Sequence, residues 1–214
     1  MISASVTLHG YRYSVYTRIA RLALAAKAVP FTEVDVDPFA DPAAVIAAGH
    51  PFARVPILEH GTLRVYETAA ITTYIDAAFD GPPLMPQAPS AQARAAQVIA
   101  VVDSYGYRPM VRQVFAHAVF RPALGLGGDP QEIADGLAAS APVLAALNDL
   151  AQTGEVLTGP LTRADIHLAP MMAAFTVHQA AAEQLTHHKA LWAWWQQIAR
   201  HPALIASDPG LPSP

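Results

Sequence analysis

The chain has 214 residues, no cysteine and a formal net charge of −4 at pH 7. The absence of cysteine excludes disulfide frameworks, thiolate metal sites and a cysteine nucleophile supplied by the chain itself. Only 14% of the residues are charged and there is no basic excess, which argues against a nucleic-acid partner. Because 44 residues are alanine, the strongest helix former, the composition favours a helical protein.

Neither a membrane segment nor a metal site is expected. The longest run without Asp, Glu, Lys or Arg covers residues 166–182. It is shorter than the ~20 residues of a spanning helix, so we expect a buried core helix there. The start of the chain lacks a basic segment followed by an apolar run, so a cytoplasmic location is expected. The nine histidines show no metal-ligand spacing.

Strand-like and helix-like runs alternate up to residue 80. The run Phe31–Val36 alternates with a period of two, which predicts a half-buried strand. His60, Gly61 and Thr62 form a predicted tight turn between two strands. The predicted order is βαβαββα, a small α/β domain over residues 1–80. Its strands are expected at residues 6–9, 31–36, 56–59 and 63–66, and its helices at 15–28, 42–48 and 68–79.

A proline-rich segment separates this domain from an all-helical one. Four prolines lie between Asp80 and Ser90, and proline interrupts both helices and sheet ladders, so residues 81–90 are predicted to be a linker. Beyond it, Pro109 is expected to kink or break the first helix and Pro202 to end the last. Thr162 with Asp165 predicts a capping box at the start of the third. The predicted helices cover residues 91–120, 131–150, 166–182 and 191–200.

Three segments carry a resemblance to a known family. They read SVYTRIAR from Ser14, HPFARVPIL from His50 and LRVYETAAI from Leu63. The first resembles the S-x-x-T/S pattern, the second N-P-F-G-x-V-P-x-L and the third L-x-L-x-E-S/T-x-A-I of the soluble glutathione S-transferases. The Thr162–Asp165 box has the position of that family's S/T-x-A-D segment. The resemblance covers essentially the whole chain and implies a serine-type, bacterial-like member, not a cysteine-type one.

The resemblance implies the fold and the partners. It implies a thioredoxin-like βαβαββα domain that binds glutathione as a co-substrate, followed by an all-α domain that carries a second-substrate pocket, in a cytoplasmic homodimer. The second substrate would be a small hydrophobic electrophile. The implied boundaries are residues 1–80, a linker at 81–90, and residues 91–214.

Ser14 is the candidate catalytic residue. Glutathione reacts as its thiolate, and a hydroxyl that donates to the sulfur at a helix N-terminus favours the charged form and lowers the thiol pKa. The other interpretation is an ordinary helix N-cap, which Ser favours. Neighbouring hydroxyls remain alternatives for the same role, because tyrosine serves it in other classes of the family: Tyr11, Tyr13, Tyr16 and Thr17.

The other two segments are expected to hold glutathione. In the family the proline at Pro56 is cis, which lets the Val55 backbone pair with the cysteinyl part; the alternative is an ordinary proline at a strand start. Thr68 is expected to cap the following helix and hold the γ-glutamyl carboxylate, and Glu67 to accept from the ammonium. Arg54 is a candidate partner for the glycine carboxylate. The alternatives are a simple cap, a surface acid and a solvated arginine.

The sequence departs from the family at three places. His50 stands where the family usually has Asn, and Ala53 where it usually has Gly. The segment Asp37–Pro42 is acidic, where serine-type members often carry a His or Lys that contacts the glycine carboxylate. Glutathione affinity is therefore expected to be weak, or the carboxylate to be held differently.

Candidate residues for the second substrate lie around Pro109. Tyr105, Met110 and Phe115 are apolar enough to line a pocket, although such stripes are more often core. Asp103 resembles an acid that, in some members, reaches the γ-glutamyl amine across the dimer. Two functions remain open: a glutathione transferase, or a binding or regulatory protein that keeps the fold and has lost catalysis.

Overall fold

The computed structural model describes residues 5–212, in which the chain divides into two units. The first contains the chain up to Pro83 and the segment Ala206–Pro209. The second contains Leu84–Ile205 and the chain from Gly210 onward. Together they confirm the predicted class, a thioredoxin-like N-terminal sheet with helices and a helical C-terminal region.

A four-stranded mixed sheet forms the centre of the first unit, in the order β2-β1-β3-β4. β1 runs parallel to β2 and antiparallel to β3, and β3 runs antiparallel to β4. Gly61, with φ of 61°, lies in the predicted hairpin turn between β3 and β4. The strands are β1 (Val6–Gly10), β2 (Thr32–Asp35), β3 (Ile57–His60) and β4 (Leu63–Tyr66).

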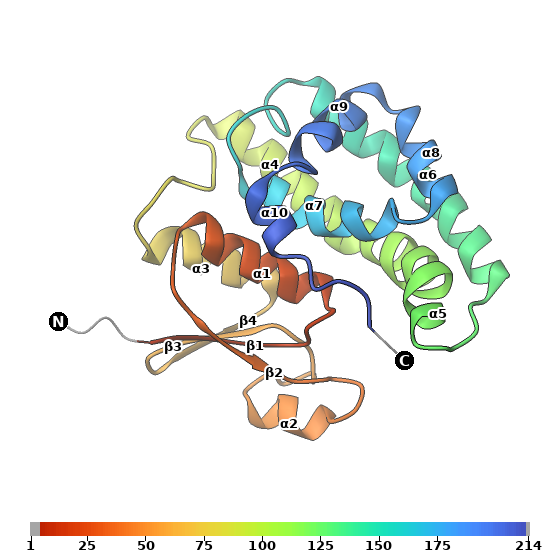
Figure 1. The fold of residues 1–214 in the computed structure, drawn as a ribbon. Coiled ribbons are helices and arrows are strands. Elements are labelled where there is room, and N and C mark those ends of the chain that lie inside the picture. The colour runs from red at the N-terminus through yellow and green to blue at the C-terminus, as the bar shows by residue number, and fades with distance from the viewer. Residues whose placement is uncertain (1–4, 213–214) are drawn as a thin grey trace. The chain divides into compact units, whose positions relative to one another are not determined.

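Helices cover both faces of this sheet. α1 (Val15–Ala26) and α3 (Thr68–Ala78) lie on one face and α2 (Pro42–Ala47) lies on the other (Figure 1). The i, i+3, i+4 spacing of Ile19, Leu22 and Ala23 places all three in the core, where they are fully buried. At the end of β1, a Cβ on Gly10 would lie 2.3 Å from Thr17 Cγ2. Glycine is therefore required for α1 to pack this closely on the strand.

The prediction for β2 is wrong in one respect. All four residues of the strand are exposed, whereas the alternation over Phe31–Val36 predicted a half-buried strand. β2 is the edge of the sheet. An alternating sequence cannot by itself indicate that both faces of an edge strand remain accessible to solvent.

Helices make up the second unit as far as it is described. α7 is its most buried helix, because 11 of its 13 residues are buried. The close approach of α6 (Pro130–Gln152) to η1 (Val102–Phe120) depends on Gly136, where a Cβ would lie 2.9 Å from the Pro109 carbonyl oxygen. The helices are α4 (Pro89–Val101), η1 (Val102–Phe120), α5 (Arg121–Ala123), α6 (Pro130–Gln152), α7 (Arg163–Phe175), α8 (Gln179–Thr186), α9 (Lys189–Ile198) and α10 (Pro202–Ala206).

Three helix predictions are corrected. Pro109 does not break its helix but lies inside η1, a π-helical stretch continuous with α4. The predicted helix over residues 166–182 is two helices, because α7 ends at Phe175 and α8 begins at Gln179. Pro202 follows α9 as predicted but also begins α10, since proline is tolerated in the first turn of a helix.

The capping box at the start of α7 is confirmed and extends to α9. The Thr162 N–H donates to Asp165 Oδ2 at 2.8 Å, and the Thr162 hydroxyl donates to the same oxygen. Trp194 Nε1 on α9 donates to Asp165 Oδ1 at 2.7 Å. Burial raises the pKa of Asp165, while the bonds from Thr162 and Trp194 oppose that rise. Asp165 thus ties the N-terminus of α7 to a second helix.

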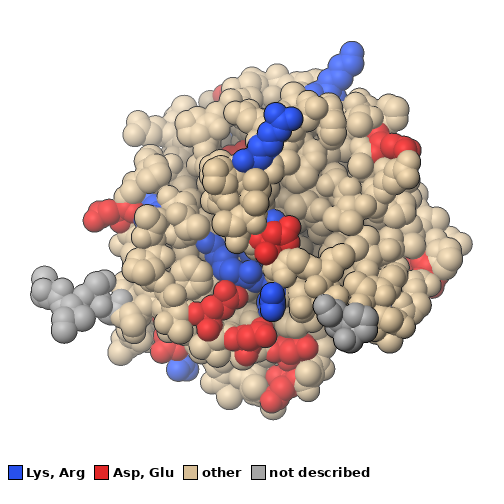
Figure 2. Space-filling model, viewed as in Figure 1, with Lys and Arg blue, Asp and Glu red and all other residues tan. Residues whose placement is uncertain are grey.

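Charged side chains are sparse on the face drawn in Figure 2, where most of the surface is uncharged. Among residues 5–212, no helix is long and apolar enough to cross a membrane. The same residues contain no cluster of three or more His, Asp or Glu side chains that could hold a metal ion.

Candidate functional site at one end of the sheet

The strand register brings the three motif segments to the same end of the sheet. His9, next to last in β1, pairs with Ile57, the first residue of β3. Ile57 in turn pairs with Tyr66, the last residue of β4. The segments that follow β1, precede β3 and follow β4 therefore meet at one edge. These segments contain Ser14, Val55–Pro56 and Glu67–Thr68.

Ser14 is the N-cap of α1. Its Oγ accepts a hydrogen bond from the Thr17 N–H at 3.3 Å, and its own N–H donates to the Tyr11 carbonyl at 2.9 Å in a tight turn. The cap uses a lone pair of the hydroxyl, and a hydroxyl carries one donor besides its two acceptor sites. The N-cap interpretation and the catalytic one are therefore compatible. The first-turn N–H groups of α1 add a field that favours an anion.

The alternative hydroxyls have different surroundings. Tyr11 packs edge-to-face on Tyr13 and on Phe39, with ring centroids 5.6 and 6.0 Å apart. Burial, followed by the charge of Asp37, raises the pKa of Tyr11, so its phenol stays protonated at neutral pH. Thr17 is fully buried against Gly10. Of Ser14, Tyr11 and Thr17, only Ser14 is the N-cap of α1.

The loop before β3 contains the implied cis bond. Val55–Pro56 is cis and leads directly into β3. Ala53, where the family usually has glycine, adopts φ of 51°. The backbone at Ala53 thus adopts the left-handed conformation that glycine favours, although this chain has an alanine there.

Replacing Ala53 with glycine is expected to stabilise the protein. The left-handed conformation costs an L-residue about 1–2 kcal/mol, whereas glycine costs about 0.5–1 kcal/mol of chain entropy. The net gain of up to about 1 kcal/mol should raise the Tm by about 2–4 °C in thermal unfolding. The matched control is Ala47→Gly in the exposed last turn of α2, which should lose up to about 1 kcal/mol. A lower Tm for Ala53→Gly would contradict this interpretation of the loop.

Glu67 and Thr68 differ from the sequence prediction. Glu67, not Thr68, is the N-cap of α3, and it makes no side-chain capping bond. Thr68 is the first helical residue and is buried. Glu67 has a positive φ of 67°, so the helical conformation begins at Thr68 and the N-cap lies one residue earlier than predicted. No local sequence motif indicates this shift. The exposed Glu67 carboxylate and the backbone N–H groups at the start of α3 lie at the end of the sheet that carries Ser14.

His50 links the loop before β3 to Glu67. Its Nδ1 accepts from the Phe52 N–H at 3.2 Å, so the hydrogen of the neutral ring lies on Nε2, which faces the Glu67 carboxylate at 3.8 Å. The ring is 2% exposed. Burial lowers the pKa of His50; the charge of Glu67 opposes this and that of Arg54 adds to it.

This environment predicts a pH dependence of stability. Because the folded-state pKa of His50 is lowered from 6.5, the unfolded chain binds the proton more readily. The contribution of neutral His50 is thus present above about pH 6.5 and lost as the pH falls below that value. The variant His50→Asn, which restores the usual family residue, should lose less unfolding free energy between about pH 7.5 and pH 5 in urea titrations. An equal loss in both proteins would contradict the assignment.

The acidic segment before this loop has local structural roles. Asp37 Oδ1 accepts from the Phe39 N–H at 2.8 Å, and Asp41 Oδ1 accepts from the Ala44 N–H at 2.9 Å as the N-cap of α2. These carboxylates close a turn and cap a helix. Arg54 is exposed, immediately before the cis bond.

The candidate residues for the second substrate lie in η1 of the second unit. Tyr105 is 68% exposed, and Phe115 is half-buried against Phe120, with ring centroids 6.1 Å apart. Met110 is fully buried, and its sulfur lies 3.4 Å from where a Cβ on Gly106 would stand. It packs in the helical core, contrary to its predicted place on a pocket wall. Asp103 Oδ2 lies 3.3 Å from Nδ1 of the buried His167.

Sequence reasoning missed the residues that hold the site in place. The contact of His50 with Glu67 joins the segment before β3 to the segment before α3. Arg12 and Arg21 flank the motif around Ser14: the Arg12 N–H donates to Asp35 Oδ1, and the Arg21 side chain donates to the Arg12 carbonyl oxygen. The sequence signal for this network was the presence of three arginines at positions 12, 18 and 21. Because their neighbours in the sequence are largely apolar, some of these side chains must be partly buried and must form ion pairs or hydrogen bonds.

Comparisons with known proteins agree with this geometry. Residues 8–83 match a family model described as glutathione S-transferase, N-terminal domain. Glutathione S-transferase F13 of Arabidopsis thaliana is 25% identical over 167 residues, which cover 76% of this chain and 75% of that protein. A glutathione S-transferase of Pseudomonas putida is 34% identical over 115 residues, 53% of this chain and 50% of that one.

A solved structure extends the similarity over both units. The apo form of glutathione S-transferase III superposes with a TM-score of 0.83 at 25% identity, and the match covers 99% of each chain. The family model matches the residues that form the sheet and the motif segments, and the structural match includes the helical unit.

Proposed function

We propose that this chain is a member of the soluble glutathione S-transferase family, and that Ser14 stabilises the glutathione thiolate for attack on a small hydrophobic electrophile; the match of residues 8–83 to the N-terminal domain of that family supports the assignment. The observation that carries the proposal is the position of Ser14 as N-cap of α1, at the end of the sheet that also holds the cis Val55–Pro56 bond and Glu67. We further propose a serine-type, bacterial-like member; the serine at the start of α1 supports the first part, and the relative from Pseudomonas putida supports the second.

The residues around Ser14 offer a complementary partner for each part of glutathione. The Val55 backbone would pair with the cysteinyl residue as an added strand does. The exposed Glu67 carboxylate would accept from the γ-glutamyl ammonium, and the N–H groups that open α3 at Thr68 would hold the γ-glutamyl carboxylate. Arg54 would pair with the glycine carboxylate. Asp103 is proposed as a further contact to the γ-glutamyl amine, supplied across a homodimer.

The chemical step follows from the thiolate. The Ser14 hydroxyl donates to the sulfur and, with the N-terminal field of α1, favours the charged form. The sulfur then uses an electron pair to form a carbon–sulfur bond, and the leaving group departs with the electron pair of the bond that breaks. No base on the protein takes part, because the thiol proton is lost to solvent when glutathione binds as its thiolate.

The helical unit is proposed to supply the surface for the second substrate. The exposed ring of Tyr105 and the half-buried ring of Phe115 are suited to apolar contact. Met110 would support that surface from the core. We further propose a cytoplasmic homodimer and a functional division into residues 1–80, a linker at 81–90 and residues 91–214.

Two assays test the proposal together. We expect the purified protein to be retained on immobilised glutathione, to elute with free glutathione, and to conjugate glutathione to a chromogenic aryl halide. Absence of both retention and turnover, with the helical circular dichroism spectrum intact, would contradict it. Retention without turnover on a panel of aryl halides, epoxides and activated alkenes would favour a binding or regulatory protein instead.

A further inference from the structure

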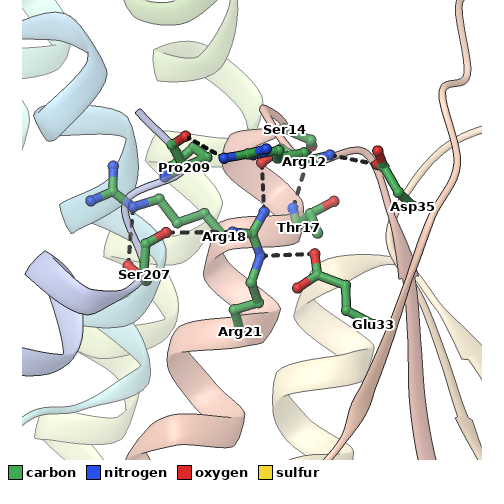
Figure 3. A network of polar contacts seen from close by, with 9 residues as sticks. All are labelled: Arg12, Ser14, Thr17, Arg18, Arg21, Glu33, Asp35, Ser207 and Pro209. Carbon is green, nitrogen blue, oxygen red and sulfur yellow. Dashed lines mark hydrogen bonds and ion pairs between the residues drawn. The ribbon is translucent and has the colours of Figure 1, made fainter. Parts of the chain in front are cut away.

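The turn that precedes Ser14 is held by side chains from two other elements. The Arg12 N–H donates to Asp35 Oδ1 on β2 at 3.0 Å, and the Arg12 carbonyl accepts from Arg21 Nη2 on α1 at 2.6 Å (Figure 3). Both backbone polar groups of Arg12 are therefore bound by charged side chains. Since Ser14 lies two residues further on and its N–H closes the turn onto the Tyr11 carbonyl, these bonds fix the place where the Ser14 hydroxyl stands.

Arg21 is itself held from two further directions. Its Nε lies 3.2 Å from Glu33 Oε1 on β2, and its Nη1 lies 3.5 Å from the Ser207 carbonyl oxygen. Burial lowers the pKa of Arg21, yet the guanidinium stays charged at neutral pH. A largely desolvated charge is tolerated where it is paired and hydrogen-bonded. The fork of Arg21 thus connects β2, the turn before Ser14 and the C-terminal segment.

The C-terminal segment Ser207–Pro209 belongs to the same unit as the sheet and contacts two more arginines. Arg18 Nε donates to Ser207 Oγ at 3.1 Å, and Arg18 Nη2 lies 3.5 Å from Asp208 Oδ2. Arg12 Nη2 lies 3.5 Å from the Pro209 carbonyl oxygen. Residues nearly 200 positions apart in the chain therefore complete one network around the first turns of α1.

We propose that Arg21, together with the segment Ser207–Pro209, forms a clamp that positions the Ser14 hydroxyl for the glutathione sulfur. The clamp rests on the proposed function of Ser14. Arg21 is a positioning residue, because it acts through the Arg12 carbonyl and does not touch the substrate. The C-terminal segment contacts Arg12, Arg18 and Arg21 and so holds these three side chains together. Without these contacts, the position of the Tyr11–Ser14 turn is no longer fixed, and neither is that of the Ser14 hydroxyl.

The clamp predicts a loss of rate that exceeds any loss of affinity. A displacement of about 1 Å at a catalytic group can cost up to about 100-fold in rate. For Arg21→Ala we expect kcat/KM to fall by about 10-fold, and a thiol pKa about half a unit to one unit higher, where one unit is a tenfold change in ionisation. Glutathione affinity should change little, because the groups proposed to bind it lie in the loop before β3 and at the start of α3.

Conservative and truncated variants separate positioning from stability. Arg21→Lys keeps the charge beside Glu33 but lacks the second arm that reaches the Arg12 carbonyl. It should recover most of the Tm lost in Arg21→Ala while the thiol pKa stays raised. A chain that ends at Ala206 should show the same raised thiol pKa, whereas a chain that ends at Gly210 keeps Ser207–Pro209 and should match the full-length protein.

The matched control is Arg121→Ala. Arg121 Nε also donates a hydrogen bond, to the Gly127 carbonyl oxygen at 2.9 Å, but it lies on α5 of the second unit. This variant should leave the thiol pKa and kcat/KM unchanged. A wild-type thiol pKa in both Arg21→Ala and the chain ending at Ala206 would overturn the clamp, as would full activity in Arg21→Lys together with full activity in Arg21→Ala.

Amide hydrogen exchange tests the clamp without glutathione. The Ser14 N–H is bound in the turn, so it should exchange slowly in the full chain and several-fold faster in Arg21→Ala and in the chain ending at Ala206. If the wild-type protein fails to bind glutathione, the proposed function fails, and the exchange rate alone decides whether the turn is clamped. If Arg21→Ala does not fold, Ser207→Ala replaces it, because that change removes the hydrogen bond from Arg18 Nε to the Ser207 hydroxyl. Unchanged exchange at Ser14 in that variant and in the truncated chain would overturn the clamp.

Discussion

Replacing Ser14 with alanine is expected to lower kcat/KM for conjugation by about 10²–10³-fold, the usual cost of removing one donor from a developing or bound anion. Glutathione affinity should stay within a few-fold of wild type, because Val55, Glu67 and Arg54 supply the binding contacts. The loss should therefore appear in kcat, measured with saturating glutathione. The variant also loses the N-cap of α1, worth about 1 kcal/mol, so its Tm must be recorded beside its kinetics.

Three control variants show which hydroxyl acts on the sulfur. Ser14→Thr keeps both the hydroxyl and the cap and should retain most of the activity. Tyr11→Phe and Thr17→Val remove neighbouring hydroxyls and should leave kcat largely unchanged. If Ser14→Ala retains its turnover while Tyr11→Phe loses it, the thiolate-stabilising role belongs to the tyrosine.

Replacing Asp165 with alanine is expected to produce the largest loss of stability. The carboxylate is 3% exposed and accepts bonds from the Thr162 N–H and hydroxyl and from Trp194 Nε1. Its removal leaves buried donors without acceptors, at about 1–3 kcal/mol each, and also removes a cap. We expect a loss of about 3 kcal/mol and a Tm lower by about 10 °C in thermal unfolding, at roughly 2–4 °C per kcal/mol.

Two variants locate this loss. Trp194→Phe removes only the bond to Oδ1 and should cost less than Asp165→Ala. Asp149→Ala, at an exposed position on α6, should change the Tm little. An Asp165→Ala protein as stable as the Asp149→Ala control would show that the link between α7 and α9 contributes nothing to the fold.

Features set by local chemistry could be predicted from the sequence. The N-cap at Ser14, the hairpin turn at Gly61 and the capping box at Thr162 each depend on a few adjacent residues, and the structure confirms all three. The apolar spacing of α1 likewise predicted the face that the helix buries. These features carry most of the fold class and place the candidate site at the start of α1.

Features that depend on distant parts of the chain could not be predicted. The exposure of β2 follows from its place at the edge of the sheet. No local sequence pattern indicates the order of the strands. The interruption between α7 and α8 contains no glycine or proline, only Thr176, Val177 and His178, so no residue type marked it. The contact of Arg21 with Ser207 joins opposite ends of the sequence, and nothing near either residue indicates the other.

The pKa of the glutathione thiol bound to the wild-type protein tests the role of Ser14 most directly. It can be measured by following the ultraviolet absorbance of the thiolate across a pH titration. Donation from Ser14 at the N-terminus of α1 predicts a pKa lower than that of free glutathione by about 1–2 units. In the Ser14→Ala variant this difference should largely disappear. A bound thiol that titrates with the pKa of free glutathione in the wild-type protein would contradict a role of Ser14 in stabilising the thiolate.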